Sequence, residues 1–353
     1  MKKLIFGALI LVLLSILALE LSLRIMKKID PSWAIMPDAT YLTYRGRPHS
    51  KELNGFRLNS RGFKDVELIQ EKNPEALRVI AIGDSQTYGA VPYPDTYISL
   101  LGNLVRRSIP HFEIYNLGVP SAAPVDYLSV LINDGLRLNP DMVLLTLFLG
   151  DDFNRGGTRR RILSRSAAFT FICELFYQYF EPRGRIFATG MYRDDIILRD
   201  RHSYIDFLVD TQLDTFYRHN PLFLKNFEST FSIIERIQEL CVARGIALAI
   251  VACPADVQLY PVPRREAIRR KGVSEEEYDF HTLNLLIKDR LNKMGIPFLD
   301  LMGHFQKRHH IDGKGFNQGN DPHWNLHGSR TAARTVAPWL TEQVRRHMKE
   351  RKS

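Results

Sequence analysis

The sequence predicts an α/β protein of three layers, α/β/α, in which helices cover both faces of a central parallel five-stranded sheet and a transmembrane helix precedes the domain. Three observations predict this fold. Five apolar runs bounded by turn residues alternate with stretches of helical periodicity. The runs are apolar on both faces, as the strands of a covered parallel sheet are. Residues 4–19 carry no charge, which is typical of a membrane-spanning segment.

The N-terminal segment is predicted to be an uncleaved membrane anchor over residues 1–28. Its apolar run continues beyond Glu20 to Arg24, without the small residues that mark the cleavage site of a signal peptide. Basic residues lie on both sides of the run. Their distribution therefore does not indicate which side of the membrane the rest of the chain occupies.

Residues 29–75 are predicted to form an N-terminal extension, and residues 76–348 the α/β domain. The extension is rich in Pro, Gly, Asn and Ser, and the two Gly-Phe pairs of "NGFRLNSRGF" indicate turns pinned by buried rings. The predicted strands are 78–83, 112–118, 142–150, 246–253 and 297–301. The predicted helices are 96–108, 124–137, 224–244 and 277–293, and a helical insertion rich in aromatic residues is expected at about 155–222.

Composition argues against several classes of function. Lys and Arg outnumber Asp and Glu by 48 to 39, which gives a net charge of +9, and much of the excess lies at the two ends of the chain. No basic stripe is interleaved with aromatic residues, so a nucleic-acid partner is not expected. The three cysteines form no C-x-x-C pair, so neither a disulfide framework nor a zinc site is indicated. We expect no metal and no cofactor.

Polar residues gather where the predicted strands end. Gly83-Asp84-Ser85 follows the first run, Asn116-Leu117-Gly118 closes the second, Gly150-Asp151-Asp152 closes the third, and "DPHWNLHG" follows the last run after a loop. In sheets of this kind, ligands bind outside the carboxyl ends of the strands. We therefore expect the four segments to converge on one edge of the sheet.

One serine in this group has the companions of a nucleophile. A serine hydroxyl needs a base within hydrogen-bond reach, an acid that orients the base, and donors for the oxyanion. Ser85 would attack, His323 would take its proton, and Asp321 would hold the imidazole tautomer. His327 is the alternative base, but it enters the predicted helix that follows, whereas His323 stays in the loop beside Asp321. In the alternative without catalysis, Ser85 or Asp84 simply caps a helix.

Four blocks in order, "IGDSQTYG", "NLGVPS", "LGDDF" and "DPHWNLHG", resemble those of the SGNH (GDSL-type) hydrolases, over roughly residues 55–342. The "NSRGFK" element and the His-Trp-Asn signature are most similar to bacterial membrane-anchored members, and also to alginate O-acetylation proteins. The resemblance implies a flavodoxin-like SGNH fold with Ser85, His323 and Asp321 as catalytic residues. It also implies an oxyanion hole formed by the backbone N–H groups of Ser85 and Gly118 and by the side chain at position 151.

Asp151 departs from the pattern of that family, which has an asparagine at this position. An ionised carboxylate donates no hydrogen bond and repels a developing oxyanion. Either Asp151 is protonated, or a neighbour such as Asn154 replaces it as donor, or activity is reduced. The loss of one such donor costs roughly 100- to 1000-fold in rate, so the departure weakens catalysis without excluding it.

The resemblance implies a serine esterase or acyltransferase acting on an acyl ester, above all an O-acetyl ester, of envelope or exported carbohydrate. It also implies a single-pass protein of the bacterial inner membrane, with the catalytic domain on the extracytoplasmic, periplasmic side. Two alternatives stay open: a lipid or general carboxylesterase, and a degenerate scaffold that binds glycan or a partner protein without catalysis. The sequence predicts neither the acyl acceptor nor the oligomeric state.

Overall fold

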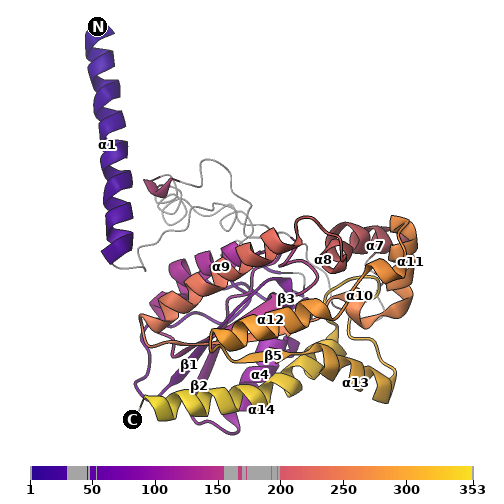
Figure 1. The fold of residues 1–353 in the computed structure, drawn as a ribbon. Helices are drawn as coiled ribbons and strands as arrows, with labels where there is room; N and C mark the ends of the chain where they lie inside the picture. Colours follow the sequence, from indigo (N-terminus) through magenta and orange to yellow (C-terminus); the bar gives the residue numbers. More distant parts are fainter. Residues whose placement is uncertain are drawn as a thin grey trace.

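The central element is a parallel five-stranded sheet with the strand order β2-β1-β3-β4-β5 (Figure 1). The computed structural model describes residues 2–29, 46, 48–52, 54–154, 166–168, 172, 192, 197 and 199–351. The strands are β1 (Leu77–Ile82), β2 (Phe112–Asn116), β3 (Met142–Phe148), β4 (Ala247–Cys253) and β5 (Phe298–Asp300). Each strand coincides with one of the five apolar runs to within two residues at either end, so the predicted fold is confirmed.

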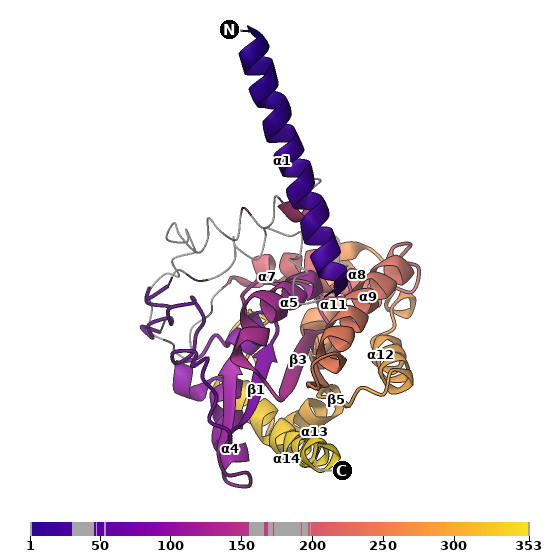
Figure 2. The same cartoon turned by 90° about the vertical axis from the view of Figure 1, so that its left-hand side faces the viewer.

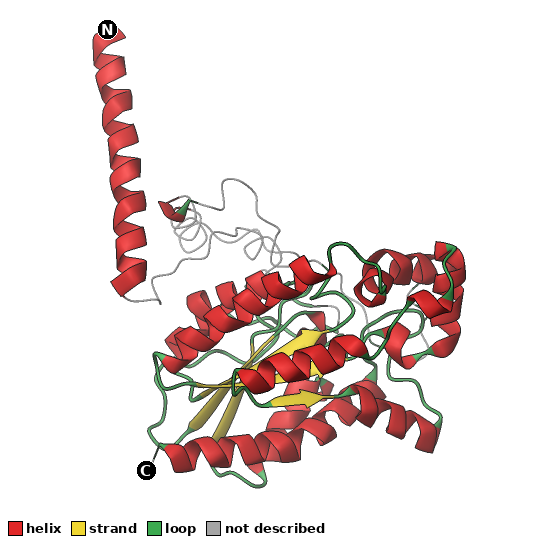
Figure 3. Cartoon of the chain, in the orientation of Figure 1, coloured by secondary structure: helices red, strands yellow, loops and turns green. Residues whose placement is uncertain are grey.

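Helices cover both faces of the sheet and complete the three layers (Figure 3). Side chains of successive strand residues point to opposite faces. In β1, Ile80 and Ile82 accordingly belong to one apolar cluster, and Val79 and Ala81 to the other. The first cluster includes α5 (Pro124–Val130), α9 (Phe223–Val242) and α12 (Thr282–Lys293), and the second includes α4 (Tyr97–Arg106), α13 (Met302–Asp312) and α14 (Leu326–Glu350).

Short helices flank the sheet and its carboxyl edge. They are α3 (Ser85–Tyr88), η2 (Tyr93–Asp95), η3 (Leu131–Gly135), η4 (Leu136–Leu138), α7 (Arg201–Leu208), η6 (Val209–Leu213), α8 (Asp214–Phe216), α10 (Asp256–Leu259), α11 (Pro261–Lys271) and η7 (Glu275–Glu277). Figure 1 shows α7, α8, α10 and α11 gathered beyond the end of the sheet where β3 terminates. Of the expected insertion at 155–222, residues 201–216 are helical, and most of 155–198 lies outside the described residues.

One helix begins later than the sequence predicts. The short 3-10 turn η7 ends at residue 277, where the helix is expected to begin, and α12 starts only at Thr282. The Asp279 carboxylate accepts hydrogen bonds from the backbone N–H groups of His281 and Thr282, each at 2.9 Å. An aspartate that bonds to the following backbone in this way competes with a continuous helix and marks its start.

The N-terminal helix α1 (Lys2–Ile29) projects away from the body of the molecule (Figure 2). Its segment Phe6–Met26 has 21 residues and a mean hydropathy of 2.5, so it is long and apolar enough to cross a membrane. A signal sequence has the same properties. Near the base of the helix, Glu20 accepts hydrogen bonds from Ser166 Oγ at 2.9 Å and from the Ala168 N–H at 2.8 Å.

Candidate active site

The loop after β1 presents Ser85 as the first residue of α3. A Cβ atom at Gly83 would lie 2.2 Å from Thr87 Oγ1, so the turn that leads into the helix has room only for glycine. The Asp84 carboxylate accepts a hydrogen bond from the Gln86 N–H at 2.9 Å and therefore caps the helix. Because Asp84 fills this role, the hydroxyl of the half-buried Ser85 is not needed as the cap.

The predicted base and its orienting acid lie in direct contact in the loop before α14. His323 Nδ1 is hydrogen-bonded to Asp321 Oδ1, which also accepts the backbone N–H of His323 at 3.0 Å. A carboxylate only accepts, so Nδ1 carries the proton and Nε2 of the neutral ring keeps a free lone pair. The Asp321 side chain is buried, whereas 28% of the His323 side chain is exposed. This arrangement suits a general base.

Gln86 ties the two loops together. Its Nε2 donates to the Pro322 carbonyl oxygen at 2.7 Å, and its Oε1 accepts the Trp324 N–H at 3.4 Å. These two residues flank His323 on either side, and Gln86 directly follows Ser85. The buried amide therefore brings the nucleophile loop and the histidine loop to the same edge of the sheet, as the sequence predicts. Nothing in the sequence pattern itself marked Gln86 for this role.

Charges around the histidine favour its protonated form. Burial lowers the pKa of His323, but the charge and hydrogen bond of Asp321 and the charge of Asp84 outweigh burial and raise it above its ordinary value. Burial raises the pKa of Asp321, but His323 and Arg199 outweigh it, so the pKa of Asp321 is lowered. Arg199 Nη2 lies 3.8 Å from Asp321 Oδ2, and its positive charge acts to lower the pKa of His323.

A second polar network, which the sequence reasoning missed, supports the histidine loop from the end of β4. The buried Asp256 carboxylate accepts hydrogen bonds from Tyr204 Oη at 2.6 Å and from Asn317 Nδ2 at 2.7 Å. Asn317 Nδ2 also donates to the Pro322 carbonyl at 2.7 Å. Burial raises the pKa of Asp256 to about 7 although these hydrogen bonds lower it. Asp256 is the third residue after the apolar run at 246–253, and the sequence alone does not show which partners it meets.

Gly118 lies against α3, at the end of β2. A Cβ atom at this position would be 2.3 Å from the Tyr88 nitrogen, so the glycine is required by close packing on the helix. The Gly118 N–H donates to Asn116 Oδ1 at 2.9 Å.

The two aspartates after β3 differ in their surroundings. Asp152 is buried and accepts hydrogen bonds from Tyr127 Oη and the Phe148 N–H, each at 2.8 Å. Burial, together with the charge of Asp84, holds the pKa of Asp152 well above its usual range. Asp151 is half-buried beside it.

Asn154, the neighbour considered as a replacement donor for Asp151, is already engaged elsewhere. Its Nδ2 donates to the Thr211 carbonyl oxygen at 3.2 Å, and its own carbonyl accepts from Asn226 Nδ2 at 2.7 Å. These contacts tie Asn154 to the segments that follow β3. They disfavour Asn154 as the third oxyanion donor.

His327, the alternative base, belongs to a different cluster. It is the second residue of α14, as expected, and its Nε2 lies 3.2 Å from Asp312 Oδ2. Its ring stacks on Phe316 with a centroid separation of 5.3 Å. Its carboxylate partner is therefore Asp312 on α13, whereas Asp321 serves His323.

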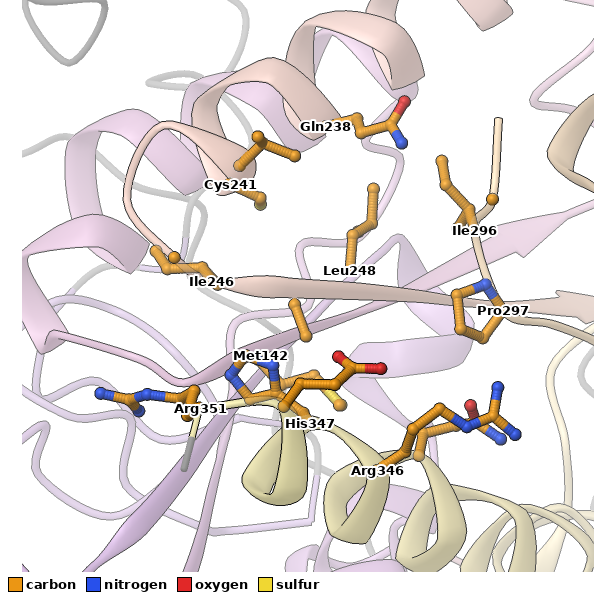
Figure 4. Close-up of a pocket in the computed structure, with 16 residues that line it drawn as sticks. Met142, Gln238, Cys241, Ile246, Leu248, Ile296, Pro297, Arg346, His347 and Arg351 are labelled. Carbon is orange, nitrogen blue, oxygen red and sulfur yellow. The ribbon is translucent and has the colours of Figure 1, made fainter. Parts of the chain in front are cut away.

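A hollow of about 460 Å³ lies at the opposite edge of the sheet from Ser85 and His323. Figure 4 shows Met142, Cys241 and Leu248 toward its interior, with Arg346 and His347 on the α14 side. None of the predicted site residues lines this hollow. Among the described residues, no group of three or more His, Cys, Asp or Glu side chains is placed to hold a metal ion.

Comparison with known proteins adds a family match. Residues 215–352 match the family model of the SGNH hydrolase-like domain of the acetyltransferase AlgX. This range contains Asp321 and His323 but not Ser85. The Pseudomonas fluorescens protein named probable alginate O-acetylase AlgJ is 28% identical over 121 residues, which span 34% of this chain and 28% of that protein. The alignment thus covers less than a third of the relative.

Two solved structures are similar over most of the chain. One is an acetyl xylan esterase, with a TM-score of 0.42 and 14% identity, covering 75% of this chain and all of that one. The other is a member of the lipolytic G-D-S-L family from Veillonella parvula, with a TM-score of 0.41 and 13% identity, covering 74% of this chain and 97% of that one. The ordered sequence blocks, the parallel sheet and the family match over residues 215–352 together support the SGNH hydrolase superfamily, with similarity to AlgX and AlgJ.

Proposed function

We propose that this protein is a serine esterase or acyltransferase in which Ser85, His323 and Asp321 form the catalytic triad. The observation that carries the proposal is the Gln86 amide, which bonds to both neighbours of His323 and directly follows Ser85. The Asp321–His323 contact supports it by leaving Nε2 of the imidazole as the available base.

In the proposed reaction, Ser85 Oγ attacks the carbonyl carbon of an ester while His323 Nε2 takes the hydroxyl proton. The tetrahedral oxyanion collapses, the alkoxide leaves with the proton from His323, and the acyl group stays on Ser85. Water or a second hydroxyl then attacks the acyl-serine by the same proton transfers, which gives hydrolysis or acyl transfer. Asp321 stabilises the imidazolium in both halves of the reaction.

The proposed oxyanion donors are the backbone N–H groups of Ser85 and Gly118. As the first residue of α3, Ser85 has an N–H without an acceptor inside the helix. An oxyanion bound at the Gly118 N–H would replace or share its present acceptor, Asn116 Oδ1. Asp151 stands where a third donor is expected, so we propose a slower reaction than an asparagine at this position would support.

The proposed substrate is an O-acetyl ester of an envelope or exported carbohydrate. This proposal rests on the similarity to AlgX, named an acetyltransferase, and to AlgJ, named an alginate O-acetylase. The apolar helix α1 fits an anchor that holds the domain at the membrane, outside the cytoplasm. A binding protein without catalysis is the second candidate, and it is favoured by the carboxylate at Asp151.

Turnover of p-nitrophenyl acetate by the full chain in detergent micelles tests the proposal. Ser85→Ala should abolish turnover and leave Tm nearly unchanged, because Asp84 and not Ser85 caps α3. His323→Ala should lower kcat by several orders of magnitude. His327→Ala is the matched control and should lower it little, since that imidazole pairs with Asp312. Undiminished turnover in Ser85→Ala would rule out the triad.

A further inference from the structure

We propose that Asp65, in the N-terminal extension, is a positioning residue that holds the end of β2 against the helix beginning at Ser85. The inference rests on the proposed function and adds to that site a residue outside both the AlgX match and the four sequence blocks.

A turn that is fixed by hydrogen bonds and by a buried ring places Asp65 next to the sheet. The side-chain oxygen of Asn59 accepts hydrogen bonds from the N–H groups of Arg61 and Phe63, both at 3.0 Å. Gly62 has a φ of 80°, a conformation that favours glycine. The Phe63 ring is buried in the apolar core between the sheet and α5. The extension is therefore packed against the domain where it reaches Asp65.

Asp65 accepts a hydrogen bond from a backbone N–H of β2 that faces away from the sheet. β2 lies at the edge of the sheet, and the Leu117 N–H donates inward to the Ala81 carbonyl at 2.8 Å. The preceding Asn116 N–H therefore faces away from β1, where the sheet offers no partner. Asp65 Oδ2 accepts this N–H at 2.5 Å. The carboxylate takes the place of a missing neighbouring strand.

The Asn116 side chain connects the end of β2 to the proposed site through two hydrogen bonds. Its Oδ1 accepts the Gly118 N–H at 2.9 Å, and its Nδ2 donates to the carbonyl of Thr87 in α3, also at 2.9 Å. One residue thus fixes the Gly118 loop and the nucleophile helix relative to each other. Asp65 in turn fixes the backbone of Asn116.

The neighbouring Lys64 holds the same helix from its other end. Its ammonium group is fully buried, donates to the carbonyls of Gly89 at 2.9 Å and Val91 at 2.7 Å, and pairs with Glu52 at 3.0 Å. These two carbonyls lie in the chain that directly follows α3. Adjacent residues of the extension therefore hold both the exit of the nucleophile helix and the strand end beside it.

The contacts of Asp65 on its other side provide a matched control. Asp65 Oδ1 accepts from Tyr93 Oη at 2.6 Å and from the Val66 N–H at 2.8 Å. Tyr93→Phe removes one bond of the same carboxylate but leaves its bond to Asn116. Asp65→Asn keeps an oxygen for the Asn116 N–H, while its amide group donates to the tyrosine oxygen and no longer accepts the Val66 N–H.

The experiment measures kcat and KM for p-nitrophenyl acetate, Tm, and amide hydrogen exchange of residues 116–118 in the full chain. Asp65→Ala should lower kcat by about 10- to 100-fold with KM changed by no more than about twofold. Its amides at 116–118 should exchange faster than in the wild type. Asp65→Asn and Tyr93→Phe should each keep kcat within about threefold of the wild-type value, because both retain the bond to Asn116.

A wild-type kcat in Asp65→Ala, or an equal loss in Tyr93→Phe, would overturn the inference. If Asp65→Ala does not fold, Asp65→Glu makes the same test, because its longer side chain displaces the oxygen that accepts the Asn116 N–H. A wild-type kcat in Asp65→Glu would also overturn the inference. The experiment distinguishes a failure of this inference from a failure of the proposed function. Turnover that survives Ser85→Ala refutes the triad, whereas turnover lost in Ser85→Ala but kept in Asp65→Ala refutes only this inference.

Discussion

Replacement of Gln86 by leucine tests how the nucleophile and the base are held together. Gln86 is buried, and it spans the two loops through one hydrogen bond of 2.7 Å and one of 3.4 Å. The Pro322 carbonyl keeps its second donor, Asn317 Nδ2, in the variant. The Trp324 N–H loses the Gln86 oxygen that accepts it.

The expected cost in stability is small. A neutral buried hydrogen bond contributes about 1 kcal/mol net, and the stranded Trp324 N–H adds a similar amount, so unfolding should become easier by roughly 1–2 kcal/mol. A domain with a stability of about 5–15 kcal/mol remains folded after such a loss, and Tm should fall by a few degrees. Any large drop in kcat therefore reflects displacement of Ser85 and His323 relative to each other and not unfolding of the domain.

We expect Gln86→Leu to lower kcat for p-nitrophenyl acetate by about 10- to 100-fold, because the tie between Ser85 and His323 is lost. Gln238→Leu is the matched control, since that amide donates to the Met294 carbonyl at 2.8 Å, near the opposite edge of the sheet. It should lower Tm by a similar amount and leave kcat unchanged. Equal kcat in the Gln86 variant and the wild type would show that the Gln86 amide does not hold Ser85 and His323 in register.

Further predictions concern pH, the oxyanion hole and the anchor. The rate should fall as pH drops through the raised pKa of His323, because only the neutral imidazole accepts a proton. Asp84→Asn should lower the pKa of His323 and move this fall in rate to lower pH, whereas Arg199→Met should raise the pKa and move it to higher pH. A pH–rate profile that neither variant shifts would contradict the assignment of His323 as the base. Asp151→Asn should raise kcat by about tenfold, since the amide donates to the oxyanion; an unchanged rate would place residue 151 outside the hole. N-terminal sequencing of the mature chain should find residues 4–25 retained, and protease should reach the domain from the periplasmic side; a cleaved N-terminus would contradict the anchor.

The fold could be predicted from the sequence because its signals are local. The buried parallel strands are apolar on both faces, and the runs at 142–150 and 246–253 appear as β3 and β4 with nearly the expected bounds. The start of α12 was missed because the Asp279 side chain, rather than any periodicity, decides where that helix begins. The bounds of single helices thus depend on individual capping contacts.

The candidate site was predictable in part, because nucleophile, base and acid have chemical identities that a sequence displays. The contact between His323 and Asp321 follows from their spacing in one loop. The supporting residues Gln86, Asp256 and Asp65 could not be recognised. Their roles depend on partners roughly 50 to 240 residues away, which only the folded chain brings together.

Labelling of the full chain with a fluorophosphonate, followed by mass spectrometry of the modified peptide, tests whether Ser85 is an activated nucleophile. The probe reacts with a serine only where a base activates the hydroxyl and donors stabilise the oxygen that becomes negative. We expect a single adduct on Ser85, formed in the wild type and absent in His323→Ala. An adduct on another serine, or no adduct in a folded wild-type protein, would contradict it.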